Sequence, residues 1–208
     1  MNLPAHSDLK RLIDQARGGD ASVLGKLLEG YRNYLTLLAR LTLQRRLQGK
    51  LDESDLVQEA FLEAYRDFGQ FRGKTEQELT SWLRKILAHN LANVVRHYCG
   101  TQGRDVRLER ELEVELERSS QLAGPGLVAA RRSPSSPSRE AAHREQMVLV
   151  ADALSQLPED YREVLILRHL ESLSFPEVAK RMGRTLSSVD KLWVRALARL
   201  RRVLGVVS

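Results

Sequence analysis

Residues 153–205, "ALSQLPEDYREVLILRHLESLSFPEVAKRMGRTLSSVDKLWVRALARLRRVLG", decide the fold of the C-terminal part of this chain. Pro158 starts one helix, residues 175–182 form a short second helix, and Gly183 supplies a turn that tolerates positive φ. Thr185 then caps a long final helix. The pattern predicts a helix-turn-helix. From the helical spacing of apolar residues, we expect the inward side of the final helix to carry Leu186, Val189, Trp193, Ala196, Leu197, Leu200, Val203 and Leu204.

This segment is also strongly basic. Between Glu177 and Leu204 there are two acids, Glu177 and Asp190, against eight cations, which are Lys180, Arg181, Arg184, Lys191, Arg195, Arg199, Arg201 and Arg202. Such an excess suits the phosphate backbone of a nucleic acid, because each neutralised phosphate releases condensed counterions. The alternative is an ordinary helical hairpin with a solvated basic face, since two helices and a glycine turn are a weak signature by themselves.

Composition excludes several classes of protein. The 208 residues carry a net charge of +6, and 42% are hydrophobic, which is enough for real cores. The single cysteine, Cys99, excludes an internal disulfide framework, and the apolar runs are too short to span a bilayer. The N-terminus lacks the apolar segment of a secretion signal, so we expect a cytoplasmic protein without membrane insertion. His89, His97 and Cys99 lack the repeated pairs of a zinc site. We therefore predict no metal, no cofactor and no enzymatic activity, because no catalytic set is present either.

A segment rich in Ser, Pro and Gly separates two helical regions. Residues 119–144 lose apolar periodicity, so we expect them to form a flexible linker between residues 5–118 and residues 145–206. In the first region we expect helices that begin after Ser7, after Asp20 (with one apolar face over residues 24–39) and near residues 52–55. Further helices are expected over residues 79–98 and, in preference to a strand, over residues 106–116. The predicted fold class is all-α, with two small helical domains.

Three blocks of the sequence resemble a known protein family. "DESDLVQEAFLEAYRDFGQFRG" (residues 52–73), "SWLRKILAHNLANVVR" (81–96) and "LSQLPEDYREVLILRHLESLSFPEVAKRMG" (154–183) resemble the sigma-70 family of RNA polymerase sigma factors, in particular its extracytoplasmic-function branch. The resemblance implies a region 2 helical bundle over residues 5–118 and a region 4 helix-turn-helix domain over residues 145–206. It also implies core RNA polymerase and promoter DNA as partners, an anti-sigma protein as a further candidate partner, and a monomer when free.

The family also implies roles for three groups of residues. The helix of "DLVQEAF" matches the part of region 2 that binds core polymerase, through Asp55, Gln58, Glu59, Glu63 and Arg66. The following segment matches the part that recognises and melts the −10 element, through Arg72, Lys74, Arg84, Lys85, Asn90, Asn93, Arg96 and His97. The final helix matches the reader of the −35 element, through Arg184, Ser187, Ser188, Asp190, Lys191, Val194, Arg195 and Arg199.

Aromatic side chains and loop length bear on the −10 site. Phe71 and Trp82 offer surfaces on which an unstacked base can stack, although a Trp in a helical apolar stripe is expected to be core. The loop over residues 73–81, "GKTEQELTS", is about two residues longer than the usual family loop. We therefore expect the geometry of a base pocket to differ here.

The predicted function is promoter-directed transcription initiation, with −10 and −35 recognition and assistance in strand opening. The alternative is a helix-turn-helix regulator that works without polymerase and uses its N-terminal helices for dimerisation or sensing. A monomer that binds core polymerase favours the first, and a dimer that binds a palindrome unaided favours the second.

Overall fold

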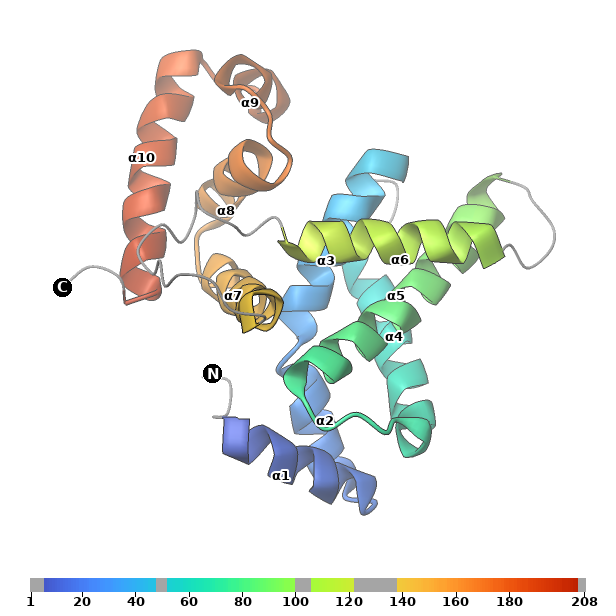
Figure 1. Ribbon diagram of the computed structural model, residues 1–208. Coiled ribbons are helices and arrows are strands. Elements are labelled where there is room, and N and C mark those ends of the chain that lie inside the picture. The colour runs from blue at the N-terminus through green and yellow to red at the C-terminus, as the bar shows by residue number, and fades with distance from the viewer. Residues whose placement is uncertain (1–5, 48–51, 100–105, 122–137, 206–208) are drawn as a thin grey trace. The chain divides into compact units, whose positions relative to one another are not determined.

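The computed structural model describes residues 6–47, 52–99, 106–121 and 138–205. Within these ranges the regular elements are all helical (Figure 1), which confirms the predicted fold class. The chain divides into two compact units, residues 1–118 and residues 119–208. No helix in the described ranges is both long and apolar enough to cross a membrane.

The first unit is a bundle built around a long helix. Its elements are α1 (His6–Arg17), α2 (Ala21–Glu29), α3 (Arg32–Leu47), α4 (Glu53–Asp67), the short 3-10 helix η1 (Phe68–Gln70), α5 (Glu76–Cys99) and α6 (Val106–Gln121), which continues three residues past the boundary at residue 118. Helix α4 packs against α3 and α5, and α1 packs against α2. Leu35, Leu38, Val57, Leu87 and Leu91 are fully buried and form the centre of the core.

Capping residues set several helix starts as the sequence predicts. The Asp20 carboxylate accepts hydrogen bonds from two backbone amides of α2 at 3.0 and 3.1 Å, and Asp52 accepts one from α4 at 2.8 Å. The prediction that Ser7 caps α1 is wrong, because α1 begins one residue earlier, at His6. The apolar face expected over residues 24–39 is also divided, because α2 ends before Gly30 and α3 begins at Arg32.

The second unit contains the predicted helix-turn-helix. Its elements are α7 (Ser138–Ser155), α8 (Glu159–Leu165), the π-helix η2 (Ile166–Leu170), α9 (Phe175–Met182) and α10 (Leu186–Val203). Helix α10 packs against α8 and α9. Val164, Leu165, Leu167 and Leu170 are all buried and form a small core in this unit.

Helices extend into both ends of the segment that was predicted to be a linker. Helix α6 continues to Gln121 and α7 begins at Ser138, so residues 119–121 and 138–144 are helical, and residues 122–137 lie outside the described ranges. Favourable helix formers such as Glu140, Ala141 and Ala142 explain why α7 begins before residue 145, where the second domain was predicted to start.

Candidate functional site

One exposed face of α4 combines acidic, polar and apolar side chains. Asp55, Gln58 and Glu59 are exposed, and residues spaced by three or four positions share a helix face. Leu62 continues this face with 64% of its surface exposed. Sequence reasoning missed Leu62, although a leucine within a polar strip is the signal that would have found it. An exposed apolar residue among carboxylates is suited to protein contact.

The two remaining residues predicted on this face have partners within the bundle. Glu63 is only partly exposed and accepts a hydrogen bond from Asn90 at 2.8 Å, which connects α4 to α5. Arg66 is exposed and pairs with the neighbouring Asp67 at 3.1 Å. That hydrogen bond raises the pKa of Arg66 above its usual value. The structure therefore leaves Asp55, Gln58 and Glu59 as the predicted residues that are most available to a partner.

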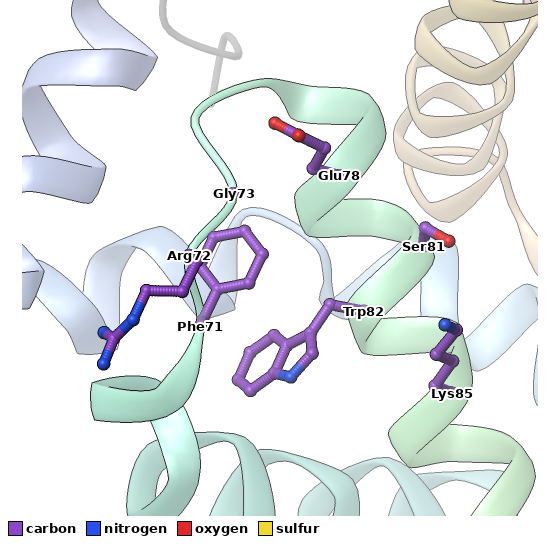
Figure 2. A pocket seen from close by; sticks show the side chains of 7 residues that line it. All are labelled: Phe71, Arg72, Gly73, Glu78, Ser81, Trp82 and Lys85. Atoms are coloured by element: carbon purple, nitrogen blue, oxygen red, sulfur yellow. The ribbon is translucent and has the colours of Figure 1, made fainter.

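A pocket lies where η1 leads into α5. It has a volume of about 330 Å³ and is lined by Phe71, Arg72, Gly73, Glu78, Ser81, Trp82 and Lys85 (Figure 2). The Phe71 and Trp82 rings lie 5.1 Å apart between centroids, and Phe68 supports both rings at 5.6 and 5.8 Å. Phe71 is buried and Trp82 is partly exposed. The pocket therefore presents an aromatic wall with cations at its rim.

Glycine at position 73 is required by the close approach of the chain to this aromatic cluster. A Cβ atom there would lie 2.3 Å from Cζ of Phe71 and 2.7 Å from Cβ of Glu78. The Gly73 carbonyl also accepts a hydrogen bond of 2.6 Å from Arg17 of α1, which ties the loop to the bundle. Sequence reasoning did not find the bond between Arg17 and Gly73, because it joins residues 56 positions apart in the chain.

Glu78 organises the start of α5. Its carboxylate accepts hydrogen bonds from the backbone amides of Lys74 and Thr75, at 2.8 and 3.0 Å, and from the Thr75 hydroxyl at 2.9 Å. The backbone amide of Glu78 donates back to the Thr75 hydroxyl at 3.2 Å, which completes a capping box. The bonds from Lys74 and Thr75 lower the pKa of Glu78.

This capping box corrects the prediction of a longer loop at residues 73–81. Residues from Glu76 onward belong to α5. Residues 76–81 of the predicted loop are therefore helical, and only the short segment from Phe71 to Thr75 connects η1 to α5.

The polar residues predicted along the −10 segment divide into exposed and buried groups. The exposed or partly exposed members are Arg72, Lys74, Lys85, Asn93, Arg96 and His97. Arg84 and Asn90 are the exceptions, with 2% and 8% of their surfaces exposed. Arg84 donates to the Tyr34 hydroxyl at 2.9 Å and pairs with Glu117, and Asn90 donates to Glu63 and to the Ile86 carbonyl at 3.0 Å. Assigning these two residues to DNA is therefore wrong, because their polar groups are used inside the bundle.

In the second unit, the turn between α9 and α10 has the predicted conformation. Gly183 has φ of 62°, and the Thr185 side chain accepts a hydrogen bond from the Ser188 amide at 3.3 Å. A capping box that the sequence analysis did not identify begins α9, where Glu177 accepts from the Ser174 amide and hydroxyl at 2.7 and 2.6 Å. These bonds lower the pKa of Glu177. Both ends of α9 are thus defined by local chemistry.

Trp193 fixes the inner side of α10. Its indole Nε1 donates to His169 Nε2 at 3.0 Å, and its ring meets the Phe175 ring edge-on at 5.4 Å. Burial, with a smaller contribution from neighbouring Arg168, lowers the pKa of His169. A neutral His169 is the form that accepts this hydrogen bond, so α10 is anchored by an unprotonated imidazole.

The opposite side of α10 is available to solvent. Of the residues predicted to contact the −35 element, Arg184, Ser187, Asp190, Lys191, Val194, Arg195 and Arg199 are exposed, and Ser188 is partly exposed. Val194 has 58% of its surface exposed. Arg184 forms an ion pair of 2.6 Å with Asp160 of α8. Leu186, predicted to face inward, is 47% exposed because it lies in the first turn, before α10 reaches the core.

Among the described residues, no three His, Cys, Asp or Glu side chains are grouped so as to hold a metal ion. The functional features are therefore surfaces and one pocket: the α4 face, the pocket with the polar side chains of α5, and the outer side of α10.

Comparison with known proteins adds three findings. Residues 31–100 match the family described as Sigma-70 region 2, and residues 147–200 match Sigma-70, region 4. The chain is 30% identical over 185 residues to the ECF RNA polymerase sigma-E factor of Haemophilus influenzae, covering 89% of each protein. It is 28% identical over 188 residues to the RNA polymerase sigma-H factor of Pseudomonas aeruginosa, covering 90% of this chain and 89% of that protein. The solved RsbN-BldN complex aligns with a TM-score of 0.32 at 23% identity, over 92% of this chain and 98% of that one.

Proposed function

Because the chain belongs to the sigma-70 family of RNA polymerase sigma factors, in its extracytoplasmic-function branch, we propose that it directs core RNA polymerase to promoters. The observation that carries this function is the occurrence of both regions in one chain, in order, over residues 31–100 and 147–200. A helix-turn-helix regulator that works without polymerase has no need of region 2. The chain acts in the cytoplasm as a binding factor, and the nucleotide chemistry belongs to the polymerase.

The test of this function is reconstitution. The purified chain is expected to associate with core RNA polymerase and to support run-off transcription from a subset of genomic promoters that core polymerase alone does not use. Absence of association with core polymerase contradicts the function, and unaided binding of a dimer to palindromic DNA would favour the alternative regulator.

For polymerase binding, we assign the α4 face formed by Asp55, Gln58, Glu59 and Leu62. Its support is the exposure of three polar side chains around one exposed leucine. A central apolar contact within a polar rim is the usual anatomy of a protein interface. Leu62→Ala and Glu59→Lys should each weaken binding to core polymerase, measured by fluorescence anisotropy, without loss of helical content.

The matched control for this face is Glu111→Lys, a reversal of one exposed glutamate on α6. It changes the net charge as Glu59→Lys does, so a general electrostatic effect would appear in both variants. If Glu59→Lys and Glu111→Lys bind core polymerase equally well, the α4 face is only solvated.

For promoter opening, we assign the pocket beside Trp82 to an unstacked base. The support is the partly exposed indole, its stacking support from Phe71, and the cations Arg72 and Lys85 among the lining residues. Base stacking on an aromatic side chain contributes about 1–3 kcal/mol. Trp82→Leu should therefore impair open-complex formation on duplex promoters more than on pre-melted templates. Equal losses on both templates would contradict a role in melting.

The polar end of α5 supplies a second element of the same surface. Asn93 is exposed and accepts a hydrogen bond from Arg96, which holds the two side chains together. We assign this pair to the backbone or base edges of the melted strand. Asn90 and Arg84 are left out, because they are buried.

For the −35 element, we assign base contacts to Lys191 and Arg195 and contact with a thymine methyl group to Val194. All three are exposed on the outer side of α10. Arg199, further along the helix, is assigned to a phosphate. Selection of upstream elements from a randomised promoter pool should yield a different motif for the Lys191→Ala plus Arg195→Ala variant than for the parent. Arg199→Ala should leave the motif unchanged. It should weaken binding and lower the slope of log affinity against log salt concentration by about 1.

A further inference from the structure

Helix α6 carries a stripe of glutamates, Glu109, Glu113 and Glu117, at intervals of four residues. Residues at this spacing lie on one face of a helix. Each of the three forms an ion pair with a side chain of α5.

The ion pairs follow the two helices in opposite directions. The Glu109 carboxylate lies 3.5 Å from His89 Nδ1 and 3.9 Å from Arg96 Nη2, and the Glu113 carboxylate lies 3.8 Å from Lys85 Nζ. Residue numbers therefore fall along α5 as they rise along α6. The acidic face of α6 lies over the cationic face of α5.

The C-terminal end of α6 is held more firmly. Glu117 pairs with Arg84, whose buried guanidinium also donates to Tyr34 of α3. Leu112 and Leu116, on the adjacent stripe of α6, are completely buried. These contacts hold the C-terminal half of α6 against the bundle.

Two of the side chains that pair with α6, Lys85 and Arg96, belong to the surface assigned above to promoter DNA. Lys85 also lines the pocket beside Trp82. The carboxylates of α6 lie beside the cations that a DNA phosphate would approach. A carboxylate and a phosphate therefore compete for the same cation. We infer that α6 is an autoinhibitory helix, which covers the DNA-binding face of α5 in the free chain and is displaced when DNA binds. This inference rests on the proposed function, because it requires that face to bind DNA.

The exposure of the Lys85–Glu113 pair explains how DNA can begin to displace α6. Lys85 has 62% of its side chain exposed and Glu113 has 42%, so their attraction is weakened by water and screened by salt. A promoter offers a continuous row of phosphates and the entropy of released counterions. Of the three glutamates, Glu113 is therefore the one whose pair DNA displaces first.

The experiment measures binding of the full chain to fluorescein-labelled oligo(dT) by fluorescence anisotropy at one fixed low salt concentration. Glu109→Gln removes the ion pair with Arg96 and the carboxylate beside His89, and it should increase affinity by roughly twofold to fivefold, the usual size of a single ion pair. The matched control is Glu111→Gln, which makes the same change of net charge at an exposed position two residues away. Equal affinities of the two variants would overturn the inference.

A further variant separates this inference from the proposed function. Arg96→Ala is introduced into the Glu109→Gln chain, and loss of affinity for oligo(dT) shows that α5 binds DNA. If that loss occurs while Glu109→Gln and Glu111→Gln bind equally, autoinhibition fails and the DNA-binding face stands. If Arg96→Ala has no effect, the DNA-binding face itself fails, and the inference fails with it.

Hydrogen exchange supplies a second readout that does not depend on any substitution. Backbone amides of α6 in the parent chain should exchange faster when oligo(dT) is bound, because displaced helices lose protection. Unchanged or greater protection of α6 in the DNA complex would contradict displacement.

Discussion

Replacement of Gly73 by Ala tests the architecture of the base pocket more directly than removal of any lining side chain. The added Cβ would lie 2.3 and 2.6 Å from two carbons of the Phe71 ring and 2.7 Å from Cβ of Glu78. Carbon atoms pack optimally at about 3.5–4.0 Å, so the ring must move by roughly an ångström. Phe71 is 5% exposed and packs on Phe68 and Trp82, which leaves little room for such a shift.

The expected cost follows from this crowding. Overpacking a well-packed core by one carbon costs about 1–3 kcal/mol. For a domain of about 100 residues, each kcal/mol lowers the melting temperature by about 4–8 °C. We therefore expect Gly73→Ala to lower the melting temperature of the first unit by at least about 4–8 °C, the shift for 1 kcal/mol. The substitution should also displace the Phe71 ring from the wall of the pocket.

The assay follows thermal unfolding through Trp82 fluorescence in a Trp193→Phe background, so that the signal comes from the first unit alone. The matched control is Gly69→Ala, since a Cβ at Gly69 meets nothing within 4 Å. Phe71→Leu in the Gly73→Ala chain removes ring atoms from the crowded space and should recover part of the loss. If Gly73→Ala melts at the same temperature as Gly69→Ala, the close approach does not shape the pocket.

Three further predictions concern stability. Arg84→Met should destabilise the first unit by about 2–3 kcal/mol in urea denaturation, because the bonds of the buried guanidinium to Tyr34 and Glu117 are removed; an effect below about 0.5 kcal/mol, the usual range of surface changes, would show that these bonds do not hold α6. Gly183→Ala should cost the second unit about 1–2 kcal/mol in thermal melting, because Ala is strained at φ of 62° although its Cβ has open space. For His169, whose pKa is lowered in the folded chain, the unfolded state binds the proton more tightly, so stability is present at neutral pH and is lost as pH falls below the ordinary pKa of 6.5; the fluorescence of Trp193 in a Trp82→Phe chain should report this loss, and His169→Gln should abolish the pH dependence.

Local chemistry in the sequence determined most of the helix boundaries. Asp20 and Thr185 cap helices as predicted, and Asp52 caps α4, whose start was expected near residues 52–55, because a side-chain oxygen close to a free backbone amide acts over two or three residues. Gly183 takes the left-handed conformation for the same local reason, since it lacks a Cβ. The family resemblance followed from blocks that can be recognised without any structure, and the later comparisons confirmed it.

The burial of polar residues was decided only by tertiary structure. Helical periodicity shows which residues share a face, but it does not show which other element covers that face. Arg84 was predicted to contact DNA, yet its partners Tyr34 and Glu117 lie 50 and 33 positions away in the chain. The 64% exposure of Leu62 likewise depends on which elements pack beside α4. The position of α6 over α5 depends on the same kind of long-range contact, so the pattern of charges on either helix alone did not predict it.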